Sequence, residues 1–281
     1  METTDFYIRT MSEAELDLAI GWAADEGWNP GLNDRTPFYE ADRAGFFMGL
    51  LNDEPIGCIS AVAYDKSFGF IGLYIVRAGF RDKGYGIKLW QHAVNYLGDR
   101  NIGLDGVLAQ QENYKKSGFK LAYRNIRYEG TGGKFDVPSE VVPLSGVSFD
   151  EVLSYDRRLF PAERVNFLKL WITQPGHIAL AILDKSRLAG FGVMRPCRVG
   201  FKLGPLFADN ADLADTLFWA LKSFVPGQRV YLDIPEVNPL AVSLAEKHKL
   251  TRVFETARMY TKATPEIEIE KLFGITTFEL G

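Results

Sequence analysis

The residues best placed to do chemistry lie between Gly72 and Leu97, in the segment GLYIVRAGFRDKGYGIKLWQHAVNYL. The pattern predicts a strand that ends at Val76, then a loop with two closely spaced glycines, then a helix whose apolar residues repeat at helical spacing. Backbone N–H groups at a helix start lack partners and attract anions, and glycines let an anion approach closely. With the positive charges of Arg81 and Lys83, the segment predicts a phosphate-binding turn.

Other interpretations of this turn lead to different proteins. A glycine pair alone is also typical of an ordinary turn that begins a helix. The dinucleotide-binding fingerprint requires a third glycine where Leu89 stands, and it belongs to an early parallel unit, whereas antiparallel strands are expected here. The nucleotide-binding pattern G-x-x-x-x-G-K-[ST] does not occur in the sequence. Both nucleotide-binding motifs are therefore excluded.

The loop RDKGYG, from Arg81 to Gly86, resembles the R/Q-x-x-G-x-G/A signature of the GNAT superfamily of acyl-CoA-dependent N-acyltransferases. A second family element, Y-x-x-x-G-F, is matched from Tyr114 to Phe119. The resemblance covers roughly residues 5 to 130. The sequence departs from the family pattern at Ala78, where proline is common, and at Asp82, where glycine is frequent.

This resemblance implies a site for acetyl-CoA and no metal. The strand before the loop would leave the backbone N–H of Val76 free to bond the thioester carbonyl, and Tyr114 would donate to the departing thiolate. Phe119 is expected in the core. The residues implied to hold acetyl-CoA are Ile75, Val76, Arg81, Asp82, Lys83, Gly84, Tyr85, Gly86 and Ile87.

Whether the reaction needs a general base depends on the pKa of the acceptor amine. Making an α-amino group neutral at pH 7 costs about 1.4 kcal/mol, whereas a lysine side chain costs roughly 4.6 kcal/mol. The candidates are Glu26 and Asp34, in a loop that borders the acceptor cleft in the family, although charged loop residues are usually solvated. Trp28 and Asn29 are candidates for shaping the same cleft. Tyr64, Asp65 and Tyr74 could line it from the central strands. His92 falls on the motif helix and is expected to be a surface or packing residue.

A length of 281 residues corresponds to about two domains. The first half predicts a helix over residues 12–26, strands over 6–10, 44–51, 55–64 and 68–76, a strand over 104–109, a short helix over 111–117 and a strand over 119–128. With the resemblance, the fold class is α/β (α+β), a mixed, mostly antiparallel twisted sheet flanked by helices. We expect domains at 1–130 and 147–281, joined by the glycine- and proline-rich linker 131–146.

The second half repeats the pattern of the first. Gly57 matches Gly190 and Gly72 matches Gly204 at nearly constant spacing, and Asn113 and Asn238 form a looser third pair, which favours a duplicated fold over chance. The acidic FADNAD stands where RDKGYG would recur, so no CoA is expected in this half. It could instead close over the first site. Asp233, Glu236 and Asn238 offer polar groups, but Asn238-Pro239 is better explained as a helix start.

Composition excludes several classes of function. A net charge of −4 argues against a nucleic-acid partner. The N-terminus lacks a signal-peptide pattern and no apolar run is long enough to span a membrane, so a cytoplasmic protein is expected. Two cysteines and three histidines, widely separated, argue against a disulfide framework or a metal site.

These observations predict an N-acetyltransferase that moves an acetyl or short acyl group from acetyl-CoA to the amine of a small molecule. The alternatives are a non-catalytic acyl-CoA-binding or sensing protein and a structural dimerisation protein. The sequence leaves the acceptor, the acyl length and the oligomeric state open.

Overall fold

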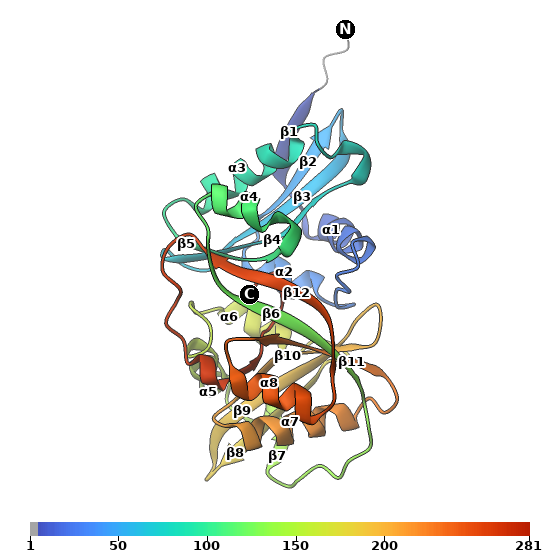
Figure 1. Ribbon diagram of the computed structural model, residues 1–281, viewed down its shortest axis with the longest axis vertical. Helices are drawn as coiled ribbons and strands as arrows, with labels where there is room; N and C mark the ends of the chain where they lie inside the picture. Colours follow the sequence, from blue (N-terminus) through green and yellow to red (C-terminus); the bar gives the residue numbers. More distant parts are fainter. Residues whose placement is uncertain (1–4) are drawn as a thin grey trace.

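The structure is a computed structural model and describes residues 5–281 (Figure 1). Its helices are α1 (Glu13–Asp25), α2 (Arg35–Ala41), α3 (Tyr85–Leu97), α4 (Gln111–Lys116), α5 (Phe149–Arg157), α6 (Val165–Trp171), α7 (Ala211–Ser223) and α8 (Pro239–Lys247). Its strands are β1 (Phe6–Thr10), β2 (Phe46–Leu51), β3 (Glu54–Ala63), β4 (Phe68–Val76), β5 (Asn101–Val107), β6 (Lys120–Thr131), β7 (Val141–Pro143), β8 (Ile178–Asp184), β9 (Arg187–Pro196), β10 (Phe201–Ala208), β11 (Arg229–Pro235), β12 (Thr251–Tyr260) and β13 (Leu272–Gly274). Among the described residues, no helix is both long and apolar enough to cross a bilayer.

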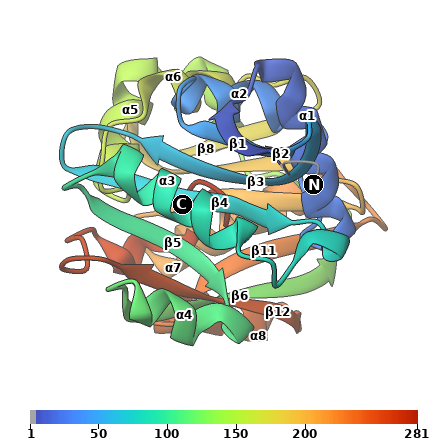
Figure 2. The same ribbon diagram turned by 90° about the horizontal axis from the view of Figure 1, so that it is seen from above.

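All strands belong to one sheet that runs through both halves, in the order β1-β2-β3-β4-β5-β12-β6-β11-β10-β9-β8-β7, with β13 paired to β10. Most neighbours are antiparallel, and the pairs β4–β5 and β10–β11 are parallel. In the first half, α1 and α2 pack on one face and α3 on the other (Figure 2). The predicted mixed, mostly antiparallel sheet flanked by helices is confirmed.

The two halves exchange strands at the centre of this sheet. Strand β12, near the end of the chain, lies between β5 and β6, and β6 in turn pairs with β11 of the second half. The boundaries at 1–130 and 147–281 therefore stay a prediction, since each half contains a strand from beyond them. This exchange makes the two halves share backbone hydrogen bonds, and not only side-chain contacts.

The C-terminal segment, residues 275–281, is buried between the halves. Its backbone passes two glycines that the sequence pairs with each other, Gly72 on β4 and Gly204 on β10. A Cβ at Gly204 would lie 2.5 Å from the carbonyl oxygen of Thr276, and a Cβ at Gly72 would overlap the carbonyl oxygen of Glu279. Glycine at both places is required for this close approach.

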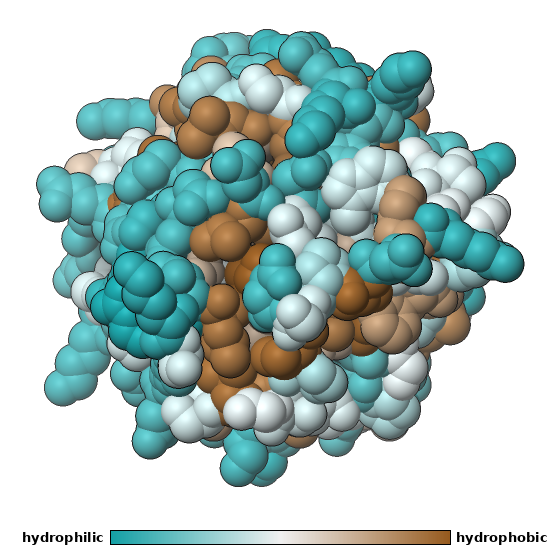
Figure 3. Space-filling view, turned by 90° about the horizontal axis from the view of Figure 1, so that it is seen from below, coloured by the Kyte–Doolittle hydropathy of each residue, from teal (hydrophilic) through white to brown (hydrophobic). Residues whose placement is uncertain are grey.

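The C-terminal half forms the lower end of the molecule, where apolar side chains gather near the centre of the face among polar ones (Figure 3). The linker 131–146 contacts α7 in this half, because the ring of Phe135 packs against Trp219. On α8, the predicted helix start is confirmed: the Asn238 side chain accepts hydrogen bonds from the backbone N–H groups of Leu240 and Ala241, at 3.0 and 3.4 Å. Asn113 lies inside α4 and not at its start, so this third pair of matched residues does not share a role.

Candidate active site

The two parallel strands β4 and β5 separate to form an opening at the centre of the first half. Their pairing runs from Phe68↔Asn101 to Ile71↔Leu104, whereas β4 continues to Val76 and β5 to Val107. At the point of separation, Leu73 has a φ of 45°, an uncommon value for a side-chain-bearing residue, and the register with β3 shifts. This bulge turns the end of β4 away from β5.

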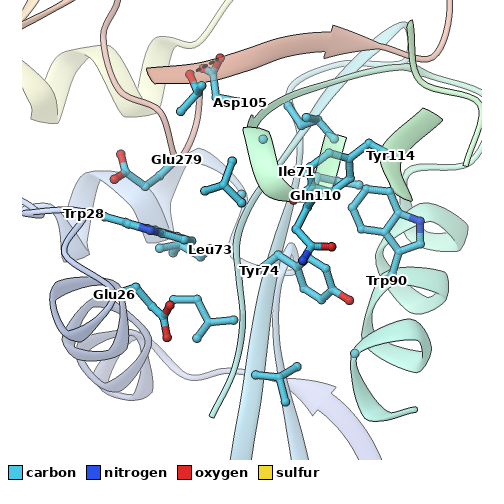
Figure 4. Close-up of a pocket in the computed structure, with 18 of the residues that line it drawn as sticks. Glu26, Trp28, Ile71, Leu73, Tyr74, Trp90, Asp105, Gln110, Tyr114 and Glu279 are labelled. Carbon is cyan, nitrogen blue, oxygen red and sulfur yellow. Dashed lines mark hydrogen bonds between the residues drawn. The ribbon is translucent and has the colours of Figure 1, made fainter. Parts of the chain in front are cut away.

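The opening is part of a cavity of about 450 Å³. Figure 4 shows Trp90 and Tyr114 on one side of β4, and Glu26, Trp28 and Glu279 on the other. The lining residues are Glu26, Trp28, Ile71, Gly72, Leu73, Tyr74, Ile75, Val76, Arg81, Asp82, Gly84, Gly86, Ile87, Trp90, Leu104, Asp105, Gly106, Val107, Gln110, Tyr114, Phe254, Thr256, Phe278 and Glu279. The cavity therefore spans both sides of the strand end.

The glycine-rich loop borders this cavity with free backbone donors. Within the described part of the chain, the backbone N–H groups of Asp82, Lys83 and Gly84 make no hydrogen bond. Helix α3 begins after Gly84, which has a φ of 84° and no side chain to cap the first turn. The first N–H groups of a helix have no intrahelical partner, and the helix dipole adds positive potential. The loop is therefore built to bind an anion.

Seven of the nine residues expected to hold acetyl-CoA line the cavity: Ile75, Val76, Arg81, Asp82, Gly84, Gly86 and Ile87. Lys83 does not, because its Nζ donates to the carbonyl of Gly79 at 2.9 Å. The Tyr85 ring packs against Phe6, with 4.8 Å between ring centroids. These two residues contribute to the loop through their backbone rather than through their side chains.

Tyr114, on α4, is buried and lines the cavity. Its ring packs against Trp90, with 5.4 Å between centroids. Gly106 on β5 makes room for it, since a Cβ there would overlap the Tyr114 ring. Burial raises the pKa of the Tyr114 hydroxyl, so the group keeps its proton at neutral pH and can act as a hydrogen-bond donor.

Glu26, one of the two candidate bases, lies in the cavity but is paired. Its carboxylate forms an ion pair with Arg81 of the glycine-rich loop. Arg81 also donates from Nε to the carbonyl of Val76, at 2.7 Å. The residue predicted as a base, Glu26, and the residue predicted to bind the anion, Arg81, are thus paired with each other at the cavity.

Asp34, the other candidate base, does not line the cavity. Its carboxylate is fully buried, accepts the backbone N–H of Gly31 at 2.7 Å and pairs with Arg195 at 3.0 Å. It joins the loop after α1 to strand β9 of the second half. Asp34 is therefore placed as a structural ion pair between the halves.

The remaining candidates divide between the cavity and the packing around it. Trp28 and Tyr74 line the cavity. Asn29 instead binds the backbone of Val199, at 2.9 Å in each of two hydrogen bonds, and so ties the loop to the second half. The others have structural contacts: Tyr64 bonds the Leu280 carbonyl, Asp65 accepts in the turn before β4, His92 packs on Phe47, and Asp233 pairs with Arg127.

Sequence reasoning missed the cavity residues that come from β12 and the C-terminal segment. Phe254, Phe278 and Glu279 line the cavity. Asp105 on β5 was also missed, and both its oxygens are engaged by Arg258, at 3.0 and 2.6 Å. No local motif marks these residues, because β12 and the C-terminal segment reach the cavity only through the tertiary fold and Asp105 lies in an ordinary strand pattern.

The second half has the same strand separation, but the chain itself fills it. Pairing of β10 with β11 ends at Leu203↔Leu232, and β13 then pairs with β10 at Leu206 and Phe207. The helix that follows, α7, is capped by Asn210, whose side chain accepts the backbone N–H of Leu213 at 3.0 Å. In the second half, β13 therefore fills the opening between the strands, and the Asn210 side chain caps the helix start that is free in the first half.

Separated parallel strands followed by an uncapped, glycine-rich helix start define a class of protein, the acyl-CoA-dependent acyltransferases. The comparisons agree: residues 10–119 match the acetyltransferase (GNAT) family and residues 152–274 match an acetyltransferase (GNAT) domain. The chain belongs to the GNAT acetyltransferase family, and it is an acyltransferase with two GNAT domains.

Similar proteins extend over nearly the whole chain. The holothin acyltransferase of a Pseudoalteromonas species is 34% identical over 269 residues, which cover 95% of this chain and 92% of that protein. A solved protein from Pyrococcus horikoshii, described as a candidate acetyltransferase, has a TM-score of 0.85 at 23% identity and covers 100% of this chain and 98% of its own. A tandem GNAT protein from the clavulanic acid biosynthesis pathway has a TM-score of 0.66 at 14% identity, covering 93% and 99%.

Proposed function

We propose that the protein transfers an acetyl or short acyl group from acyl-CoA to the amine of a small molecule, by direct attack in the first-half cavity. The observation that carries this proposal is the set of unpaired backbone N–H groups at Asp82, Lys83 and Gly84 beside the separated end of β4. A pyrophosphate fits these donors, and the acyl chain then runs into the opening between β4 and β5.

The acyl group lies against β4 in this arrangement. The backbone N–H of Val76 is positioned to donate to the thioester carbonyl oxygen as negative charge develops there. The amine nitrogen attacks the carbonyl carbon, the carbon–sulfur bond breaks, and the sulfur leaves as a thiolate that accepts a hydrogen bond from Tyr114. Because burial raises the pKa of Tyr114, its part is to stabilise the thiolate by a hydrogen bond. The proton that the amine nitrogen loses on forming the amide passes through solvent to the thiolate, which leaves as the CoA thiol.

A small-molecule acceptor is supported by the dimensions of the site. The cavity of about 450 Å³ is large enough for a pantetheine end and a small amine, and Phe278 and Glu279 of the buried C-terminal segment form part of its lining. The similar protein named holothin acyltransferase acts on a small molecule by its name, which is consistent with this size. The second half, with its opening filled by β13, binds no CoA in this proposal.

Acetyl-CoA should therefore bind at one site per chain and release free CoA when a suitable amine is present. The measurement is calorimetric titration with acetyl-CoA, followed by thiol detection of CoA release with a panel of amines that includes tryptamine, benzylamine and ethanolamine. Binding without release across the panel would favour the alternative of an acyl-CoA sensor. Absence of binding would refute the site itself.

A further inference from the structure

We infer that Glu279 accepts the proton of the acceptor amine, and that the aromatic wall formed by Trp28, Phe254 and Phe278 selects amines with a flat apolar body. This inference rests on the proposed function, since it names the acceptor side of that same site. All four residues line the cavity, and Figure 4 shows Trp28 and Glu279 on the side of β4 opposite Tyr114. The Arg127 guanidinium, which donates to the Trp28 carbonyl, lies within 6 Å of the ring centres of Phe254 and Phe278, at 5.8 and 4.7 Å.

Glu279 differs from the other carboxylates around the cavity in having a buried oxygen free. The residue is 3% exposed, and its Oε2 has no hydrogen-bond partner among the described residues. Asp105 is engaged by Arg258 through both oxygens, and Glu26 is paired with Arg81. A buried acceptor atom without a partner is costly, so it indicates a site that a ligand donor completes.

The position of Glu279 is fixed by its backbone. The N–H groups of Glu279 and Leu280 both donate to Thr277 Oγ1, at 3.0 and 2.9 Å, and the Leu280 carbonyl accepts the Tyr64 hydroxyl at 2.8 Å. The backbone carbonyl of Glu279 lies against Gly72, at the separated end of β4. The carboxyl group is therefore held beside the strand along which the acyl group would lie.

Buried cations on the central strand β6 and on the second half contact the neighbouring parts of the wall. Arg127 on β6 and Lys202 on β10 both donate to the carbonyl of Trp28, at 3.0 Å each. The Arg127 guanidinium also lies 4.7 Å from the centre of the Phe278 ring. Together with Arg195 on β9, these cations interact electrostatically with Glu279. The second half thus contributes residues to the acceptor side of the first-half cavity.

The chemical step balances with the groups present. The amine nitrogen forms a bond to the thioester carbon while one N–H proton passes to the Glu279 carboxylate, and the carbon–sulfur bond breaks to give an amide and a thiolate hydrogen-bonded to Tyr114. A proton then returns from the carboxyl group to the thiolate through solvent as the products leave. No oxidant, reductant or further reactant is required.

The test compares Glu279→Gln with Glu266→Gln, which makes the same change at an exposed position of the C-terminal region. Kinetics are measured with acetyl-CoA and tryptamine or ethanolamine, and acetyl-CoA affinity is measured by calorimetry. We expect Glu279→Gln to lower kcat by about 100-fold or more, with acetyl-CoA affinity within twofold of the parent and Glu266→Gln unchanged. In Glu279→Ala, added formate should restore part of the turnover, which a purely structural role would not predict.

Three outcomes separate the possible failures. A parent protein that binds acetyl-CoA but acetylates no amine refutes the proposed function, and Glu279 with it. An active parent whose Glu279→Gln variant stays within threefold in kcat refutes Glu279 alone. A parent that prefers ethanolamine to tryptamine refutes the aromatic selection. If Glu279→Gln fails to fold, a formate-insensitive Glu279→Ala variant that folds and binds acetyl-CoA gives the same refutation.

Discussion

Gly72→Ala is the substitution that tests most directly how the C-terminal segment is seated. A Cβ at position 72 would overlap the carbonyl oxygen of Glu279 and lie 2.8 Å from its carbonyl carbon, whereas ordinary contact begins at 3.4 Å. The obstacle is backbone, so rotation of a side chain cannot relieve the overlap. Either β4 or the C-terminal segment has to move by more than half an ångström.

The segment has little freedom to make that shift. Leu280 is fully buried, and its carbonyl is held by the Tyr64 hydroxyl at 2.8 Å. Overpacking of this kind costs about 1–3 kcal/mol of the free energy of unfolding. For a chain of this size each kcal/mol corresponds to roughly 2–4 °C, so the expected fall in Tm is about 2–12 °C.

The assay is thermal unfolding followed by near-ultraviolet circular dichroism, with Gly146→Ala as the matched control. A Cβ at Gly146 meets no atom within 4 Å, and its φ is not positive, so the same chemical change there should leave Tm nearly unaltered. Gly72→Ala should also lower turnover more than acetyl-CoA affinity, because it displaces Glu279. A Tm equal to that of the Gly146→Ala control would show that the segment is not seated against β4.

Three further substitutions test the rest of the site. In Gly86→Val, the Cβ at the helix start would lie 2.7 Å from the Tyr74 hydroxyl. Acetyl-CoA binding, measured by calorimetry, should weaken at least ~10-fold, and parent-like affinity would refute the anion site. Tyr114→Phe removes a hydrogen bond to a charged sulfur, about 1.5–3 kcal/mol, so kcat should fall roughly 10- to 100-fold with acetyl-CoA affinity unchanged. Asp34→Asn leaves Arg195 buried without its counter-charge and should cost about 3–5 kcal/mol in denaturant unfolding; a stable, inactive variant would restore Asp34 as a base.

Much of the first half could be predicted from the sequence because its signals are local. The helix after Ser12 follows a capping box and begins one residue after its predicted start, at Glu13. The helix predicted after the glycine-rich loop is α3, which begins at Tyr85, between the two glycines. The strand before the glycine-rich loop was predicted over 68–76, where β4 lies. The same locality places Tyr114 beside the opening, because its motif fixes a short helix against β5.

The elements that were missed depend on tertiary contacts. The sequence predicted no helix between residues 26 and 44, but α2 begins at Arg35 with Pro37 in its first turn. Its Phe38 is buried against Trp171, with 6.2 Å between ring centroids. The C-terminal segment carries no helical or strand period, yet all of it is buried. Local patterns also do not predict the position of β12 between β5 and β6, because the sequence of a strand does not specify its neighbours in the sheet.

Each half has a pair of parallel strands that separate, β4 and β5 in the first and β10 and β11 in the second. The end of the chain, from β13 onward, makes the two openings different. In the second half the chain pairs β13 with β10 beyond Leu203, and so fills the space that separated strands leave. It then passes Gly204 at Thr276 and reaches Gly72 at Glu279, and Phe278 and Glu279 line the first-half cavity there. Strand β13 thus fills the opening of the second half, and the C-terminal segment that follows it lines the cavity of the first, which explains why the duplicated fold keeps the opening between β4 and β5 but not the one between β10 and β11.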